Sequence, residues 1–106
     1  MFGRHVTMKL KPNSVAELPR IVENDVLPLL RKQKGLSDEI SFVSPERSVA
    51  VSISLWDTKE DAEAYNLTGY PEVLRTLASV LEGTPTVATF ETVTSTFHKA
   101  AAAKAA

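Results

Sequence analysis

Few side chains in this sequence are suited to acid–base or nucleophilic chemistry. The 106 residues include two histidines, His5 and His98, and no cysteine. Thiolate catalysis, cysteine-ligated metal and disulfide bonds are therefore excluded, and two imidazoles are too few for a dedicated transition-metal site. The sequence contains no HExxH motif, phosphate-binding glycine loop or nucleophile elbow. What is left is proton transfer by histidine or tyrosine.

Trp56, Tyr65, Asn66 and the two histidines each have a chemical and a packing interpretation. Trp56 is the only tryptophan; we interpret it as a sheet-packing or dimer-interface aromatic, with catalysis as the alternative. The phenol of Tyr65 either packs or donates a proton at a pocket rim, and Asn66 either caps a broken helix or binds substrate. His5 is either solvated or catalytic, whereas His98 is expected to contact solvent or a partner chain.

Composition indicates one ordinary globular domain. The chain is 43% hydrophobic and 24% charged, with a formal net charge of -1, so nothing attracts it to nucleic acid or an anionic membrane. No stretch approaches the roughly 18 uninterrupted apolar residues of a membrane span. The absence of cysteine agrees with a cytoplasmic location, and we expect neither nucleic acid nor membrane among the partners.

The first half of the chain predicts a strand and a helix that position these candidates. Apolar and polar residues alternate over residues 2–11, which indicates a strand. Ser14 and Glu17 form a predicted capping box at a helix start. Pro28 lies deep in the helical pattern and should remove a hydrogen bond and bend the axis, and Gly35 should end the helix.

The second half predicts a hairpin, a broken helix and a final strand. Residues 36–44 and 49–56 are expected to pair antiparallel, the first with Leu36, Ile40 and Phe42 on one side. Thr58 is the predicted N-cap of a helical region that breaks near Gly69, restarts at Pro71 and ends at Gly83. A β-branched run at residues 86–97 predicts the last strand.

The resulting order β-α-β-β-α-β is the ferredoxin-like α+β pattern, a four-stranded antiparallel sheet with both helices on one face. We expect Val49, Val51, Ile53 and Leu55 to face the helices. The opposite face then shows Ala50, Ser52, Ser54 and Trp56, and pairing with a second copy through this sheet face would cover it.

Four strings of the sequence carry a family resemblance: ENDVLPLLRKQKGL, VSISLWDTKEDAEAY, YPEVLRTLASVLEGTP and VATFETV. Together they resemble the antibiotic-biosynthesis-monooxygenase-like (ABM) domain family, whose members are dimeric α+β barrels. The similarity extends over nearly the whole chain, to about residue 97. Members include cofactor-free monooxygenases of aromatic polyketides, haem-degrading enzymes and quinol-directed proteins.

The resemblance assigns site residues unevenly. Many members have a glutamate two residues before the tryptophan and a histidine about nine after it, where this chain has Ser54 and Tyr65. The first strand lacks the asparagine of haem-degrading relatives and offers Arg4, His5, Thr7 and Lys9 instead. Their histidine position falls near Leu74 or Arg75, so haem degradation is not expected. Polyketide monooxygenases use asparagine, tryptophan and arginine, for which the rough counterparts are Asn66, Trp56 and Arg75.

We therefore expect a homodimer of one domain over residues 1–97 with an alanine-rich tail at residues 98–106. A modest cavity should lie between each sheet and its helices. One hypothesis is a cofactor-independent monooxygenase acting on an electron-rich aromatic or quinol, with the catalytic residues His5, Tyr65 and Arg75, substrate-binding Trp56 and Asn66, and no metal or cofactor. The other is a non-enzymatic ligand-binding or stress-associated dimer, which the departures at Ser54 and Tyr65 favour.

Overall fold

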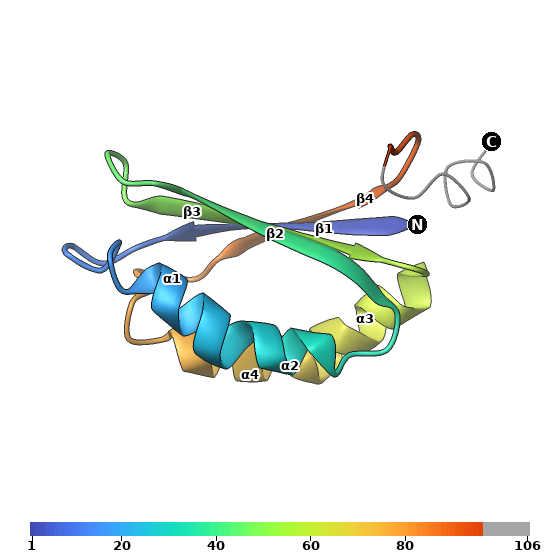
Figure 1. The fold of residues 1–106 in the computed structure, drawn as a ribbon, viewed down its shortest axis with the longest axis horizontal. Coiled ribbons are helices and arrows are strands. Elements are labelled where there is room, and N and C mark those ends of the chain that lie inside the picture. The colour runs from blue at the N-terminus through green and yellow to red at the C-terminus, as the bar shows by residue number, and fades with distance from the viewer. Residues whose placement is uncertain (97–106) are drawn as a thin grey trace.

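The chain forms one four-stranded antiparallel sheet with its helices on a single face (Figure 1). A computed structural model describes residues 1–96, so that His98 and the tail at residues 98–106 lie outside the described part. The elements are β1 (Phe2–Lys9), α1 (Leu18–Ile21), η1 (Val22–Val26), α2 (Leu27–Arg31), β2 (Leu36–Ser44), β3 (Val49–Trp56), α3 (Lys59–Leu67), α4 (Gly69–Leu77) and β4 (Thr86–Glu91).

The strand order is β2-β3-β1-β4, with every neighbouring pair antiparallel. This order and the helices on one face confirm the predicted ferredoxin-like α+β fold. The predicted hairpin of β2 and β3 is also confirmed, with the bounds that the alternation indicated. The two central strands, β1 and β3, therefore carry the residues over which the helices pack.

The first helix begins later than predicted, and the capping box at Ser14 is wrong. Glu17 is the N-cap and makes no side-chain capping bond. A helix capped by Ser14 would need the amide of Pro19 to donate to the carbonyl of Val15, and proline has no N–H. Starting at Leu18 places Pro19 in the first turn, where a missing donor costs nothing.

A π-helical segment, η1, ends two residues before Pro28. The N–H of Leu27 donates to the carbonyl of Val22, five residues back instead of four. Proline removes one helical hydrogen bond and its ring crowds the carbonyl four residues earlier, and a wider turn accommodates both effects. The predicted disturbance at Pro28 thus takes the form of a change in helical register.

The second helical region follows its predicted start but not its internal bounds. The Oγ1 of Thr58 accepts a hydrogen bond from the N–H of Asp61 at 3.1 Å, as the predicted N-cap requires. After the break, α4 begins at Gly69 rather than at Pro71 and ends well before Gly83. A Cβ at Gly69 would lie 2.7 Å from the ring of Tyr65, so glycine allows this close approach of α4.

The prediction of which side of β3 faces the helices is wrong. Ala50, Ser54 and Trp56 are buried beneath the helices, whereas Ile53 and Leu55 lie on the outer face and are partly exposed. The register sets Ile53 between His5 of β1 and Ile40 of β2 on the outer face. On β3 the inner face therefore carries small residues beside Trp56, and the outer face carries larger aliphatic ones.

An irregularity in β2 places residues that we predicted to lie on one side of this strand on opposite sides of it. The register shifts between Leu36 and Asp38, which indicates a β-bulge. The bulge places Leu36 opposite Trp56, packed against the core, while Ile40 and Phe42 remain on the outer face. None of the helices within residues 1–96 is long and apolar enough to cross a membrane.

Candidate functional site

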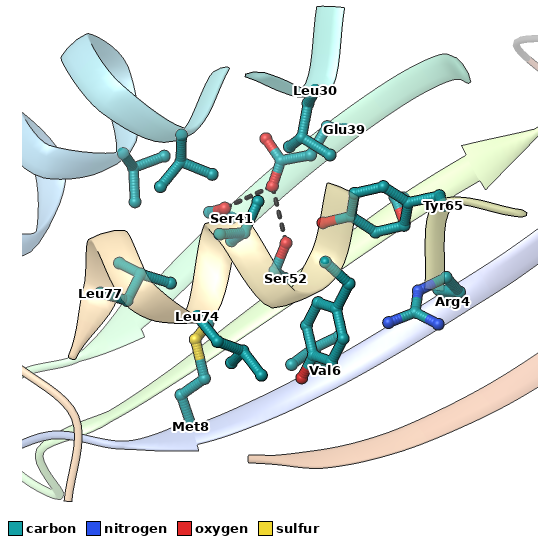
Figure 2. Close-up of a pocket in the computed structure, with 15 residues that line it drawn as sticks. Arg4, Val6, Met8, Leu30, Glu39, Ser41, Ser52, Tyr65, Leu74 and Leu77 are labelled. Carbon is teal, nitrogen blue, oxygen red and sulfur yellow. Dashed lines mark hydrogen bonds between the residues drawn. The ribbon is translucent and has the colours of Figure 1, made fainter. Parts of the chain in front are cut away.

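A cavity of about 40 Å³ lies between the inner face of the sheet and the helices (Figure 2). Its apolar wall includes Val22 and Val26 of η1 and Leu74 of α4. Its polar lining comes from three strands and two helices and consists of Arg4, Glu39, Ser41, Ser52, Ser54, Tyr65 and Tyr70. The predicted cavity between sheet and helices is therefore present.

Arg4 is the charged group buried most deeply in this lining. Only 3% of the residue is exposed, because Arg4 lies on the same helix-facing side of β1 as Val6 and Met8. One nitrogen, Nη1, donates to Oδ1 of Asn66 at 2.8 Å. The other two, Nε and Nη2, are buried and have no hydrogen-bond partner within the described chain. Unpaired buried donors are costly, so they indicate a group that a ligand would complete.

The guanidinium of Arg4 lies against two aromatic rings. Its Cζ is 4.6 Å from the ring centroid of Tyr70 and 5.2 Å from that of Tyr65. Loss of hydration in this site lowers the pKa of Arg4, and the facing tyrosines oppose that shift less strongly. Cation–π attraction holds the side chain in place but leaves the in-plane N–H groups unused.

Trp56 packs against Tyr65, behind the wall of the cavity. Its ring stacks on Tyr65 at 4.9 Å between centroids, and its Nε1 donates to Oγ of Ser54 at 2.9 Å. The indole is fully buried within its own chain. Trp56 therefore packs inside its own chain, and its predicted placement on the face awaiting a partner is wrong.

Tyr65 and Tyr70 are held as neutral phenols. Burial raises the pKa of both above the ordinary value, and the positive charge of Arg4 offsets only part of that effect. The hydroxyl of Tyr65 points across the cavity toward Glu39 (Figure 2). Tyr65 is thus placed as a hydrogen-bond donor rather than as an anion.

Glu39 brings a carboxylate to the opposite side of the cavity. Its Oε1 accepts hydrogen bonds from Ser52 Oγ at 2.8 Å and from Ser41 Oγ at 2.5 Å. In the sheet, Ser54 is paired with Arg4 on one side and with Glu39 on the other. One row across three strands therefore places a cation and a carboxylate at two ends of the same inner surface.

The residues predicted from the sequence separate into two groups. Tyr65 lines the cavity, Trp56 packs behind it, and Asn66 holds Arg4. His5 lies on the outer face of the sheet, where its ring is 6.5 Å from that of Phe90. Arg75 is exposed on α4, with Nη2 4.0 Å from the carboxylate of Glu72. Within one chain, His5 and Arg75 do not join the cluster around Tyr65.

Sequence reasoning did not single out Arg4 or Glu39. Arg4 precedes Val6 and Met8 by two and four positions, and alternation assigns all three to one face. The available signal for Arg4 was therefore a charged residue at a position that alternation assigns to the buried face of the strand. Glu39 gave no such signal, since its face depends on the bulge after Leu36. Within residues 1–96 there is also no cluster of three or more His, Asp or Glu that could hold a metal ion.

Comparison with known proteins places the fold without assigning an activity. No family model matches the sequence, and no curated protein matches it. Several solved structures do share the fold. An antibiotic biosynthesis monooxygenase superposes with a TM-score of 0.70 at 14% identity, covering 89% of this chain and 100% of the other.

Two further structures agree. A protein of unknown function from Nitrosomonas europaea has a TM-score of 0.72 at 17% identity, covering 89% of this chain and 90% of its own. A monooxygenase from Streptomyces coelicolor, solved with the ligand nanaomycin D, has a TM-score of 0.70 at 18% identity, covering 84% of each chain. The chain therefore has the ferredoxin-like α+β fold of the antibiotic biosynthesis monooxygenases, as its sequence resemblance predicted.

Proposed function

We propose that this protein binds a small electron-rich aromatic molecule between its sheet and helices and oxidises it with dioxygen, without a cofactor. One observation carries the proposal: the cavity holds a buried cation, Arg4, with two unpaired donors, and a carboxylate, Glu39, on the other side. An anionic aromatic ligand satisfies the first group and offers a hydroxyl proton to the second. The fold shared with named monooxygenases agrees with this chemistry.

The reaction balances without an added reductant. A phenol that loses its hydroxyl proton donates electrons from its ring to dioxygen, and an oxygen atom bonds to a ring carbon beside the hydroxyl carbon. The second oxygen atom leaves as water with the hydroxyl hydrogen and the hydrogen of that ring carbon. Phenol and O₂ thus give a quinone and H₂O, and the ring loses the four electrons that O₂ gains.

The described residues have distinct parts in this proposal. Glu39 accepts the phenol proton, Tyr65 donates a hydrogen bond to oxygen as charge develops, and Arg4 holds an anionic group of the ligand. Asn66 is a positioning residue that acts through Arg4. Trp56 acts through Tyr65 by fixing the plane of its ring. Closely packed apolar walls keep bulk water from the reacting oxygen.

Oxygen uptake tests the proposal directly. We expect uptake above a heat-denatured control with at least one member of a panel of phenols and quinols, and a loss of at least tenfold in Glu39→Gln. The matched control is Glu46→Gln, an exposed glutamate in the turn between β2 and β3, which should retain the wild-type rate. No uptake with any panel member would sink the oxidation proposal.

A specific observation favours a second function, binding without turnover. Two serine hydroxyls donate to Oε1 of Glu39, and such bonds stabilise a carboxylate and make it a weaker base. A ligand that binds and is recovered unchanged after aerobic incubation would support this non-enzymatic ligand-binding function.

The outer face of the sheet supports a homodimer as part of the proposal. Three large apolar side chains there, Ile40, Phe42 and Phe90, are between 52% and 59% exposed. They continue into the partly exposed Ile53 and Leu55 of β3. An apolar sheet face of this kind is rarely left to solvent. A second copy packing face to face would bury the same row on both chains, as a two-fold interface requires.

Light scattering tests the dimer. We expect about twice the 11.6 kDa chain mass for the wild type and a monomer for Ile53→Glu, because Ile53 lies at the middle of this face. Leu67→Glu is the matched control, since Leu67 is 77% exposed on α3, away from the outer face. A wild-type mass near that of one chain would contradict this part of the proposal. A cytoplasmic location, with which the cysteine-free sequence agrees, also remains part of it.

A further inference from the structure

We infer that the cavity takes a single-ring aromatic carboxylate with a hydroxyl at the far end of the ring, the carboxylate on Arg4 and the hydroxyl on Glu39. This inference rests on the proposed ligand-binding cavity and names its ligand class. It concerns binding, and it requires no turnover.

The unpaired nitrogens of Arg4 select the ligand's charged group. Nε and Nη2 present two parallel N–H groups along one edge of the guanidinium, the arrangement that matches the two oxygens of a carboxylate. Nη1 is already bonded to Asn66, and the rings of Tyr65 and Tyr70 lie against the group. A carboxylate fills both open positions at once, whereas a phenolate oxygen is a single acceptor.

The burial of Arg4 adds a reason for a negatively charged ligand. The side chain keeps its charge in a site that removes most of its hydration, and residues 1–96 give its Nε and Nη2 no hydrogen-bond partner. Burial of a charged group is unfavourable when some of its hydrogen-bond donors are left unpaired. The folded chain carries this cost without ligand, and a bound carboxylate relieves it.

Glu39 selects the other end of the ligand. Arg4, Ser54 and Glu39 occupy one row across three adjacent strands. Strands are about 4.8 Å apart, so the two outer Cα atoms of the row are roughly 10 Å apart. The carboxylate of Glu39 has about four acceptor positions, of which Ser41 and Ser52 use two. A hydroxyl that projects from the far side of a ring can occupy a third.

The size of the cavity limits the ligand to one ring. About 40 Å³ corresponds to roughly three water molecules. A single ring is larger than this space, so its binding requires an outward shift of the helical wall, which includes Val22 and Val26 of η1. A π segment such as η1 is often found at functional sites. Fused rings would require a larger shift than a single ring, and we expect the cavity to exclude them.

Calorimetric titration under nitrogen tests the ligand class without oxidation. The probes are 4-hydroxybenzoate, benzoate, phenol and the fused-ring 6-hydroxy-2-naphthoate. We expect 4-hydroxybenzoate to bind at least tenfold more tightly than benzoate or phenol, and the naphthoate to show no binding. Equal affinities for 4-hydroxybenzoate, benzoate and phenol would overturn the inference, as would naphthoate binding as tightly as the single ring.

Variants of Arg4 and Glu39 test which residue binds the carboxylate of the ligand and which binds its hydroxyl. Arg4→Met should remove the advantage of 4-hydroxybenzoate over phenol, and Glu39→Gln should weaken 4-hydroxybenzoate at least threefold while leaving benzoate unchanged. Arg47→Met and Glu46→Gln, both exposed in the β2–β3 turn, are the matched controls and should retain the wild-type affinities. Retention of the full preference in Arg4→Met would overturn the assignment.

Arg4→Lys provides a second variant should Arg4→Met fail to fold. Lysine keeps the charge but lacks the paired N–H edge, so we expect at least threefold weaker binding of benzoate; unchanged affinity would contradict the bidentate contact.

The proposed oxidation and the inferred ligand class can be contradicted separately. Binding under nitrogen without oxygen uptake in air removes the oxidation and leaves the ligand class, whereas oxidation of neutral phenols without binding of the acids removes only the ligand class.

Discussion

The two faces of the sheet differ in a way that reverses the usual arrangement of a half-buried strand. On β3 the helix side carries Ala50, Ser52 and Ser54, and the open side carries Ile53 and Leu55. Apart from Trp56, the inner side of β3 is therefore lined by small residues, which leave space for polar side chains. The outer face has the composition of a core with no second layer within the described chain.

This difference separates the requirements of a cavity from those of an interface. Small hydroxyl side chains at Ser52 and Ser54 make room for the rings of Trp56 and Tyr65 and give hydrogen-bond partners to Glu39 and to the indole. Large aliphatic residues on the inner face would fill that space. On the outer face they are suited to burial against another sheet, about 10 Å away in face-to-face packing.

The largest effect is expected for Trp56→Ala, which tests the inner face of the sheet. Removal of a fully buried indole leaves a cavity behind Tyr65, and we expect the free energy of unfolding to fall by about 3–5 kcal/mol. Chemical denaturation followed by circular dichroism measures it. The exposed Leu67→Ala is the control and should change stability by less than about 0.5 kcal/mol. A loss below about 1 kcal/mol for Trp56→Ala would remove the distinction between the two faces.

The second test uses pH, because both tyrosines of the chain lie on the helix side. Burial raises the pKa of Tyr65 and of Tyr70 in the folded state, against the opposing charge of Arg4. The unfolded chain then loses phenol protons first as pH rises. Stability is fully present below pH of about 10 and falls above it, by up to about 1.4 kcal/mol per pH unit for each tyrosine.

Denaturation at intervals between pH 8 and pH 11.5 measures that slope, and absorbance of the phenolate in the folded protein gives an independent reading. Tyr65→Phe should make the fall with pH about half as steep. Phenolate absorbance that appears near pH 10 in the folded protein would show that the rings are open to solvent and that the inner face is not closed.

The third test is Ser54→Ala. Ser54 is buried and accepts the hydrogen bond of Trp56 Nε1. Without it the indole N–H is buried and unpaired, and we expect a loss of about 1–3 kcal/mol. Thr7→Ala, on the outer face of β1 and partly exposed, should cost less. Equal losses would mean that the hydroxyl of Ser54 contributes packing volume rather than a hydrogen bond.

Most of the fold could be predicted because it depends on local signals. The strand bounds at Leu36, Ser44, Val49 and Trp56 follow from alternation and turn residues, and Thr58 caps its helix as its type indicates. The helix start after Ser14 could not be placed correctly, because the capping pattern and Pro19 gave conflicting indications. Proline decides the outcome, since no rearrangement supplies its missing N–H.

The sheet faces and the site could be predicted only in part. Alternation on β3 separates Ser54 and Trp56 from Ile53 and Leu55, but it does not say which pair faces the helices. Hydrophobicity favoured the wrong side, because on β3 most of the aliphatic residues lie on the outer face. Tyr65 was found because it stands about nine residues after Trp56, where many members of the resembled family have a histidine. Arg4 was missed because charged residues are rarely expected in a core.

The smallest expected effect distinguishes the two arginines that sequence and structure single out. Arg75 is 72% exposed in its side chain, and its 4.0 Å approach to Glu72 is an i,i+3 pair on the surface of α4. Such pairs contribute little, so Arg75→Met should change stability by less than about 0.5 kcal/mol. It should also leave the affinity for 4-hydroxybenzoate unchanged, since Arg75 does not line the cavity.

Arg4→Met, in contrast, is expected to abolish the preference for 4-hydroxybenzoate over phenol. Parallel titrations of the two variants make the comparison, and a loss of affinity in Arg75→Met equal to that in Arg4→Met would move the anion site from the inner face of the sheet to the surface of α4.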